Sequence, residues 1–123
     1  MEIEMTALPK TWILDLDGTL VKHNGYKLDG EDTLLEGAEE LLAQIRAEDM
    51  VILLTSRKLA YKELTERFLN AHHIRYDHII YDAPYGERIV INDRKPSGRD
   101  MAFAINCNRD RLHHIDIVEN ELL

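Results

Sequence analysis

The stretch WILDLDGTLV, residues 12–21, places two aspartates directly after an apolar run. Asp15 and Asp17 are separated by a single leucine. A carboxylate at the end of a core strand costs free energy unless a partner or a reaction uses it. Carboxylates can act as nucleophiles, hold a divalent cation or carry protons, so this close pair predicts chemistry. An EF-hand calcium loop does not fit, because that motif follows a helix and has glycine at its sixth position, where this chain has Leu20.

The apolar run before Asp15 is one of several short segments that we expect to form strands. Such runs, rich in Ile, Val and Leu and without alternation, indicate strands buried on both faces of a parallel sheet. They span residues 11–14, 50–54, 78–81, 88–91 and 101–105.

Two longer segments between these runs have helical periodicity. From Gly37 to Glu48, and again from about Lys58 to Ala71, apolar residues recur every three or four positions. The alternation of strands and helices predicts a three-layer, Rossmann-like α/β fold, with a parallel sheet and helices on both faces. Within residues 107–123, the tail Leu112–Leu123 fits either a last helix or a short strand.

Size and composition predict one globular domain over residues 1–123, with 45% hydrophobic and 31% charged residues. The net charge of −8 disfavours general nucleic-acid binding. The segment from Arg88 to Arg111, however, contains six basic residues and only three acids. A positively charged rim of this kind would suit a phosphorylated small molecule. Cys107 is the only cysteine, which favours a reducing, cytoplasmic setting. No secretory signal or membrane-spanning run is apparent, so we expect no membrane partner.

The polar residues that end the apolar runs are the candidates for function, because ligands of parallel α/β sheets bind outside the carboxyl ends of the strands. Three strand ends carry such residues, and the fold is expected to bring them together at one edge. They are Asp15 and Asp17, then Thr55, Ser56 and Arg57, and finally Asn92 and Asp93.

These strand ends resemble three motifs of the haloacid dehalogenase-like (HAD) superfamily, whose members are mostly phosphatases. The sequence DLDGTL at 15–20 is similar to the nucleophile motif, LLTSR at 53–57 to the second motif, and IND at 91–93 to the fourth. Order, placement after strands and spacing agree from about Thr11 to Asn106, which is nearly the whole chain.

The resemblance implies a Mg²⁺-dependent phosphoric monoester hydrolase that works through an aspartyl-phosphate on Asp15. Asp17 is then the residue that protonates the leaving oxygen and afterwards activates water. The implied metal ligands are the Asp15 carboxylate, the backbone carbonyl of Asp17 and Asp93, and Asn92 keeps an oxygen ligand beside them. A magnesium ion would cancel the repulsion between the nucleophile and a phosphate dianion.

The second motif and its neighbours are expected to hold the phosphoryl group. Thr55 is the expected catalytic hydroxyl, and Ser56 and Arg57 at the start of the next helix are expected to bind substrate. Gly18 is expected to belong to the same substrate-binding group, and it allows the backbone to turn sharply beside the site. As ordinary structure, Thr55 would be a helix N-cap and Asp93 a turn residue in the sequence NDRKPSG.

One part of the family pattern is missing. The third motif is a lysine that neutralises the phosphate and the nucleophile, and it normally precedes the fourth-motif strand, but residues 81–87 contain no lysine. The sequence in this region resembles that of capsular polysaccharide phosphatases, in which a lysine precedes Pro-Tyr-Gly and this chain has Ala83. Lys95 is the first candidate to supply the positive charge as a catalytic residue, with Lys58 and Arg88 as alternatives.

The sequence therefore predicts a small phosphatase without a cap domain that hydrolyses a phosphomonoester, with a sugar phosphate or capsule precursor as the expected substrate. Because the site is open, a neighbouring subunit of a homo-oligomer could cover it. Two alternatives stay open. The missing lysine suits a weak or inactive module that binds a phosphorylated ligand, and the open site suits a polynucleotide 3′-phosphatase, which the net charge disfavours.

Overall fold

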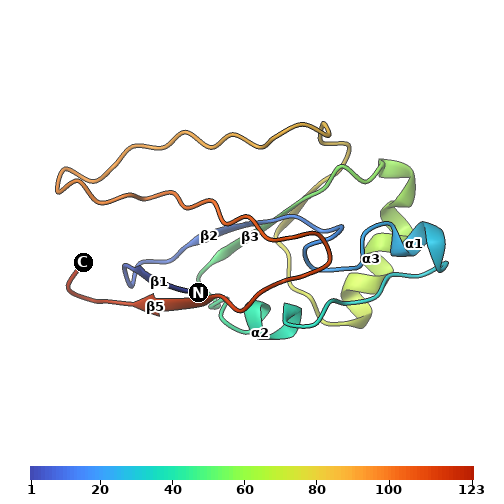
Figure 1. Cartoon of the computed structure of the whole chain (residues 1–123), viewed down its shortest axis with the longest axis horizontal. Coiled ribbons are helices and arrows are strands. Elements are labelled where there is room, and N and C mark those ends of the chain that lie inside the picture. The colour runs from blue at the N-terminus through green and yellow to red at the C-terminus, as the bar shows by residue number, and fades with distance from the viewer.

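A computed structural model describes all of residues 1–123. It has a mixed α/β architecture in which every paired strand runs parallel to its neighbour (Figure 1). The elements in chain order are β1 (Glu2–Met5), β2 (Thr11–Leu14), α1 (Gly25–Leu28), α2 (Ala38–Leu42), β3 (Met50–Leu54), a 3-10 helix η1 (Leu59–Tyr61), α3 (Lys62–Ala71), β4 (His78–Ile80) and β5 (Asp116–Glu119).

The strands form two small sheets in place of the single sheet predicted from the sequence. One sheet has the order β2–β3–β4, and the other pairs β1 with β5. In the first sheet Leu14 lies opposite Leu53, which in turn lies opposite Ile79. Because β2 and β3 run in the same direction and in this register, the residues that follow them meet at one edge of the sheet.

The core lies against β3 and the loop after β2. Val51 and Leu53 of β3 are fully buried, as are Leu16, Leu20 and Val21 in that loop. Burial of a side chain of this size stabilises the fold by about 1.5–3 kcal/mol. The loop that carries the two aspartates is therefore fixed by apolar packing on its other residues. The remaining core residues are Ala38, Leu41, Leu69, Ile74 and Ile115.

The strands predicted at 88–91 and 101–105 are not formed. Residues 83–106 instead make a long, irregular excursion, here called the arm, which leaves the end of β4 and returns towards β5 (orange in Figure 1). Ile89 and Ile91 are 81% and 92% exposed. The physical reason lies at the root of the arm, where Asp82 has a left-handed φ of 59° and Pro84 fixes its own φ and lacks an N–H. The chain turns away there before a strand can pair with the sheet.

The helix predicted from Gly37 to Glu48 is shorter in the structure and ends at Leu42. The side chain of Gln44 binds the backbone of the C-terminal segment instead, donating to Ile115 O at 2.7 Å and accepting from Ile117 N at 2.8 Å. Asp49 accepts hydrogen bonds from Arg46 N and from Trp12 Nε1. These contacts tie residues 43–49 into turns.

Other predictions agree with the structure or are resolved by it. The second predicted helix is present as η1 followed by α3, and the ambiguous tail contributes strand β5. Strand β1 was not among the predicted strands, and it pairs in parallel with β5 over four residues. None of the helices has the length and apolar character needed to cross a bilayer.

Candidate active site

The loop after β2 presents both aspartates through a tight backbone turn. The carbonyl of Leu16 accepts hydrogen bonds from Thr19 N, Leu20 N and Val21 N, and Gly18 N donates to Val21 O at 2.7 Å. Gly18 adopts a φ of +83°, which L-residues with a Cβ rarely adopt. Sequence therefore fixes this loop locally, with apolar residues directed inward and the carboxylates directed outward.

Asp15 is the more accessible of the two acids, with a side chain 34% exposed. Its Oδ2 accepts a hydrogen bond from Thr19 Oγ1 at 2.8 Å. Its Oδ1 accepts one from Arg88 Nη1, also at 2.8 Å. A carboxylate that is open to solvent and flanked by a guanidinium can approach an anionic substrate, because the positive charge reduces the repulsion between them.

Asp17 is held by Arg57, which follows β3. Arg57 Nη2 donates to Asp17 Oδ1 at 2.8 Å and Nε donates to Oδ2 at 3.3 Å. The Asp17 side chain is 16% exposed, and the Arg57 side chain is completely buried. Burial opposes the charged form of Arg57, but the hydrogen bonds that it donates to Asp32 and Asp17, together with their negative charges, outweigh this effect, so the pKa of Arg57 lies above its usual value.

Thr55 and Ser56 lie beside this pair at the carboxyl end of β3. Thr55 is buried, and its Oγ1 accepts the backbone N–H of Arg57 at 3.0 Å. Ser56 Oγ donates to the carbonyl of Pro84 at 3.2 Å, which ties the second motif to the root of the arm. The structure therefore brings together the Asp15–Gly18 loop and the whole Thr55–Arg57 segment.

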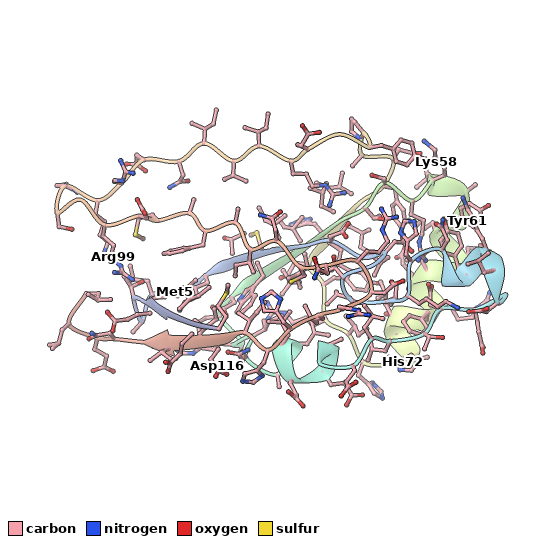
Figure 2. All side chains as sticks on the ribbon, in the orientation of Figure 1. Met5, Lys58, Tyr61, His72, Arg99 and Asp116 are labelled. Atoms are coloured by element: carbon pink, nitrogen blue, oxygen red, sulfur yellow. The ribbon has the colours of Figure 1, made fainter.

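The cations proposed to replace the missing lysine occupy different places. Arg88 contacts Asp15 directly. The ammonium of Lys58 lies 3.8 Å from Asp82 and 5.2 Å from the Tyr85 ring centroid, away from the two acids. Lys95 lies in the turn that reverses the arm, where its N–H donates to Arg99 O, and Figure 2 shows Arg99 at the far end from Lys58. Of the three, Arg88 is the one that contacts Asp15.

The predicted metal ligands are only partly assembled. The Asp15 carboxylate and the Asp17 carbonyl, which accepts no hydrogen bond, belong to one loop. Asn92 and Asp93 lie on the exposed arm, and Asn92 Nδ2 donates to Asp93 O. No group of three or more His, Cys, Asp and Glu side chains is placed to hold a metal ion. The full ligand set for Mg²⁺ implied by the family resemblance is thus not met in this arrangement.

A segment near the C-terminus covers the other side of the Gly18 loop. Asp110 N donates to Gly18 O at 2.8 Å, and His23 N donates to Asp110 Oδ1 at 2.7 Å. A Cβ added to Gly18 would lie 3.1 Å from Cγ of Arg109. The sequence offered no local signal for these contacts, nor for that of Asp32 with Arg57, because the residues lie in polar loops far from the motifs.

Two solved structures contain chains that are similar to this one. A chain in the structure of the Pnkp1/Rnl/Hen1 complex is 36% identical to this one, and the match covers 69% of this chain with a TM-score of 0.53. A chain in the structure of the Pnkp1/Rnl/Hen1 RNA repair complex gives the same identity and TM-score over 70%. This chain spans about a third of those longer chains, 32% and 30%. No family model and no curated protein matches it. The chain is thus similar to one portion of a component of an RNA repair assembly.

Proposed function

We propose that this chain is a HAD-like phosphatase that removes the terminal 3′-phosphate of a polynucleotide, with Asp15 as the nucleophile. The observation that carries the proposal is the Asp15 carboxylate, which stands open at the carboxyl end of β2 with Arg88 against it. The similarity to structures of an RNA repair complex favours a polynucleotide over a sugar phosphate. Nothing in the comparisons supports a role in capsule biosynthesis.

The first chemical step is attack on phosphorus. An oxygen of Asp15 forms a bond to phosphorus, the bond from phosphorus to the ribose oxygen breaks, and that oxygen takes a proton. In the second step water attacks the aspartyl-phosphate, which releases inorganic phosphate and restores the carboxylate. Arg88 reduces the charge repulsion as the dianion approaches, since its guanidinium lies 2.8 Å from Asp15.

Asp17 is the proposed carrier of the proton in both steps. Its two oxygens differ in how tightly Arg57 holds them, at 2.8 Å for Oδ1 and 3.3 Å for Oδ2. Oδ2 is therefore the oxygen that is freer to give a proton to the leaving ribose oxygen and to take one from water. Oδ1 keeps the carboxylate anchored while this exchange takes place.

We also propose Mg²⁺ as the cofactor. Two hard oxygen atoms of the kind that Mg²⁺ binds, from the Asp15 carboxylate and the free carbonyl of Asp17, lie on one loop, and water and the substrate phosphate would have to supply the other ligands. When bound, the ion would supply charge neutralisation at the phosphate. Chelation followed by readdition tests this: activity should vanish with excess EDTA and return with Mg²⁺. Full activity of the chelated protein would contradict the cofactor proposal.

The distribution of charge accommodates an extended anion despite the acidic total. From Arg88 to Asp100 the arm carries four basic residues and two acids. Arg94 pairs with Asp100 at 2.6 Å, which leaves Arg88, Lys95 and Arg99 as the cations without a carboxylate partner on the arm itself. The arm comes close to Asp15 at Arg88 and extends away from it. A polynucleotide whose terminal phosphate is bound at Asp15 would have its remaining phosphates along this path.

The decisive experiment compares short RNA oligonucleotides that end in a 3′-phosphate or a 5′-phosphate with a panel of sugar phosphates and p-nitrophenyl phosphate. We expect release of phosphate from the 3′-phosphate oligonucleotide, and none by Asp15→Asn. Binding of the oligonucleotide should weaken steeply with salt, with a slope of about −0.7 per phosphate contact.

Two different results would each support one of the alternative functions. Preferential turnover of a sugar phosphate, with a salt response close to zero, would contradict the polynucleotide substrate but keep the phosphatase. Binding of the 3′-phosphate oligonucleotide without any release of phosphate would contradict the enzyme and leave a binding module.

A further inference from the structure

Arg57 uses every hydrogen-bond donor of its guanidinium on side chains of its own chain. A guanidinium has five N–H donors in a planar fork. Nε and one donor of Nη2 bind Asp17, the second donor of Nη2 and one of Nη1 bind Asp32, and the last of Nη1 binds Thr65 Oγ1. All three bonds to Asp32 and Thr65 measure 2.9 Å. Arg57 therefore has no donor left for a substrate phosphate in this arrangement.

Asp32 is an acid that cannot itself reach a substrate. Its side chain is 1% exposed, against 16% for Asp17. A buried carboxylate is tolerated only when it is paired and hydrogen-bonded, and both of its oxygens are bonded to Arg57. The group carries two negative charges against one positive, so Asp32 is not needed to neutralise Arg57, because Asp17 already does so.

The planar shape of the guanidinium connects the two acids. Asp32 binds the edge formed by Nη1 and Nη2, and the ring of Tyr26 lies 3.9 Å from the Arg57 Cζ. With one edge and one face fixed, the remaining edge, Nε and Nη2, has a single orientation, and that edge meets Asp17. The contributing residues come from separate parts of the chain: Asp32 from between α1 and α2, and Thr65 from α3.

We propose that Asp32 is a positioning residue for the phosphatase reaction, because it orients Arg57 and thereby fixes the Asp17 carboxylate for proton transfer. This rests on the proposed function, in which Asp17 carries the proton. Arg57 is then a positioning residue as well, in place of the substrate-binding role expected from the sequence.

The kinetic test uses Asp32→Asn, which keeps the size of the side chain and removes its charge. We expect kcat to fall about 10- to 100-fold, as is typical when the partner of a functional group is removed. KM should stay within about twofold, since the residue does not contact substrate. The pH profile of kcat should also shift, because the Asp17 carboxylate that transfers the proton is no longer held in the same position by Arg57. Asp29→Asn is the matched control, because it removes an exposed ion pair with Lys22 in the same segment and should change neither.

A merely structural role for Asp32 has a different signature. It would lower the melting temperature and the active fraction while leaving the pH profile of kcat unchanged, and that outcome overturns the proposal. If Asp32→Asn does not fold, Thr65→Val takes its place, because it removes one acceptor of Nη1 without changing the charge. It should shift the pH profile in the same direction by a smaller amount. A profile identical to that of the wild type overturns the proposal.

A spectroscopic readout separates this proposal from the proposed function. NMR follows the Nε–H proton of Arg57 and the carboxyl carbon of Asp17 without any substrate. In Asp32→Asn the Nε–H proton should exchange faster with water and the Asp17 carbon should change its chemical shift, whereas both should be unchanged in Asp29→Asn. A protein with these shifts but no turnover of any phosphate ester contradicts the proposed function alone. An unmoved Asp17 resonance in folded Asp32→Asn overturns the positioning role alone.

Discussion

The guanidinium of Arg88 binds the carboxylate of Asp15, with Nη1 2.8 Å from Oδ1. The two residues come from distant parts of the chain, Asp15 from directly after β2 and Arg88 from the arm. Both side chains are about one-third exposed, at 34% and 35%, so the contact is open to ligands. Arg88 therefore supplies a positive charge directly beside Asp15.

Arg88→Ala should lower kcat/KM about 100-fold on the best phosphate ester, because it removes a charge-assisted donor beside the nucleophile. Arg94→Ala is the control, since Arg94 is an exposed arginine of the same arm that pairs with Asp100. Steady-state kinetics of both variants and of Lys95→Ala decides which cation takes part. A larger loss in Lys95→Ala than in Arg88→Ala would contradict the assignment.

Asp15→Asn and Asp17→Asn should impair different parts of the reaction, the formation of the covalent intermediate and the transfer of the proton. Asp15→Asn should abolish turnover, because an amide does not form the acyl phosphate. Asp17→Asn should slow it by about 10²- to 10⁴-fold, the usual contribution of general acid–base catalysis. Rapid-quench experiments with ³²P-labelled substrate measure the covalent intermediate, which should form only when Asp15 is present. Wild-type turnover by Asp17→Asn would exclude its role.

Gly18→Ala should damage both stability and turnover. The φ of +83° makes an added Cβ costly by about 1–2 kcal/mol, and that Cβ would also meet Arg109 Cγ at 3.1 Å. Gly30→Ala is a matched control, because Gly30 has a φ of +80° with open space around it. Urea unfolding should show destabilisation of both variants that is larger in Gly18→Ala, because only its Cβ meets a neighbour, and only Gly18→Ala should lose activity. Equal activity of the two would show that the Arg109 contact does not matter.

Asp49 should make stability depend on pH. Burial opposes its ionisation, but hydrogen bonds from Lys10 N, Arg46 N and Trp12 Nε1 outweigh that effect and lower the pKa of Asp49. An acid with a lowered folded-state pKa stabilises fully above its unfolded value of about 4 and loses this contribution as pH falls through the folded value. Asp49→Ala should therefore cost about 1–3 kcal/mol at pH 7 and less in acid. Denaturant unfolding at pH 7 and pH 3 measures the difference, and an equal loss at both would contradict it.

The three-stranded sheet was predictable because its signal is local. The apolar runs that end at Leu14 and Leu54, and the one that begins at His78, are each bounded by polar residues and pair in the expected parallel sense. The runs in the arm have the same composition, and yet they stay unpaired. An apolar run shows that a segment can form a strand, but the ladder also depends on where the preceding turn sends the chain. At Asp82 and Pro84 that direction is set by backbone conformation, which hydrophobic pattern does not encode.

The candidate site likewise contains residues that could be predicted from local sequence and residues that only the fold brings together. Asp15 and Asp17 form one short motif after a strand, so their chemistry could be inferred from a few neighbouring residues. Asp32 lies in a polar loop, and nothing around it in the sequence marks it as the partner of Arg57. Its role depends on a contact across 25 positions, which only the fold creates.

The arm also determines how the chain could be divided without losing its fold. A protease that cuts after Lys95 would produce one piece ending in the arm and a second piece containing β5. The second piece stays attached through the parallel pairing of β5 with β1 and through the contacts of Gln44 with residues 115 and 117. The two pieces should therefore elute together in native size-exclusion chromatography and separate only in denaturant. The chain is thus suited to reconstitution from two separately expressed fragments.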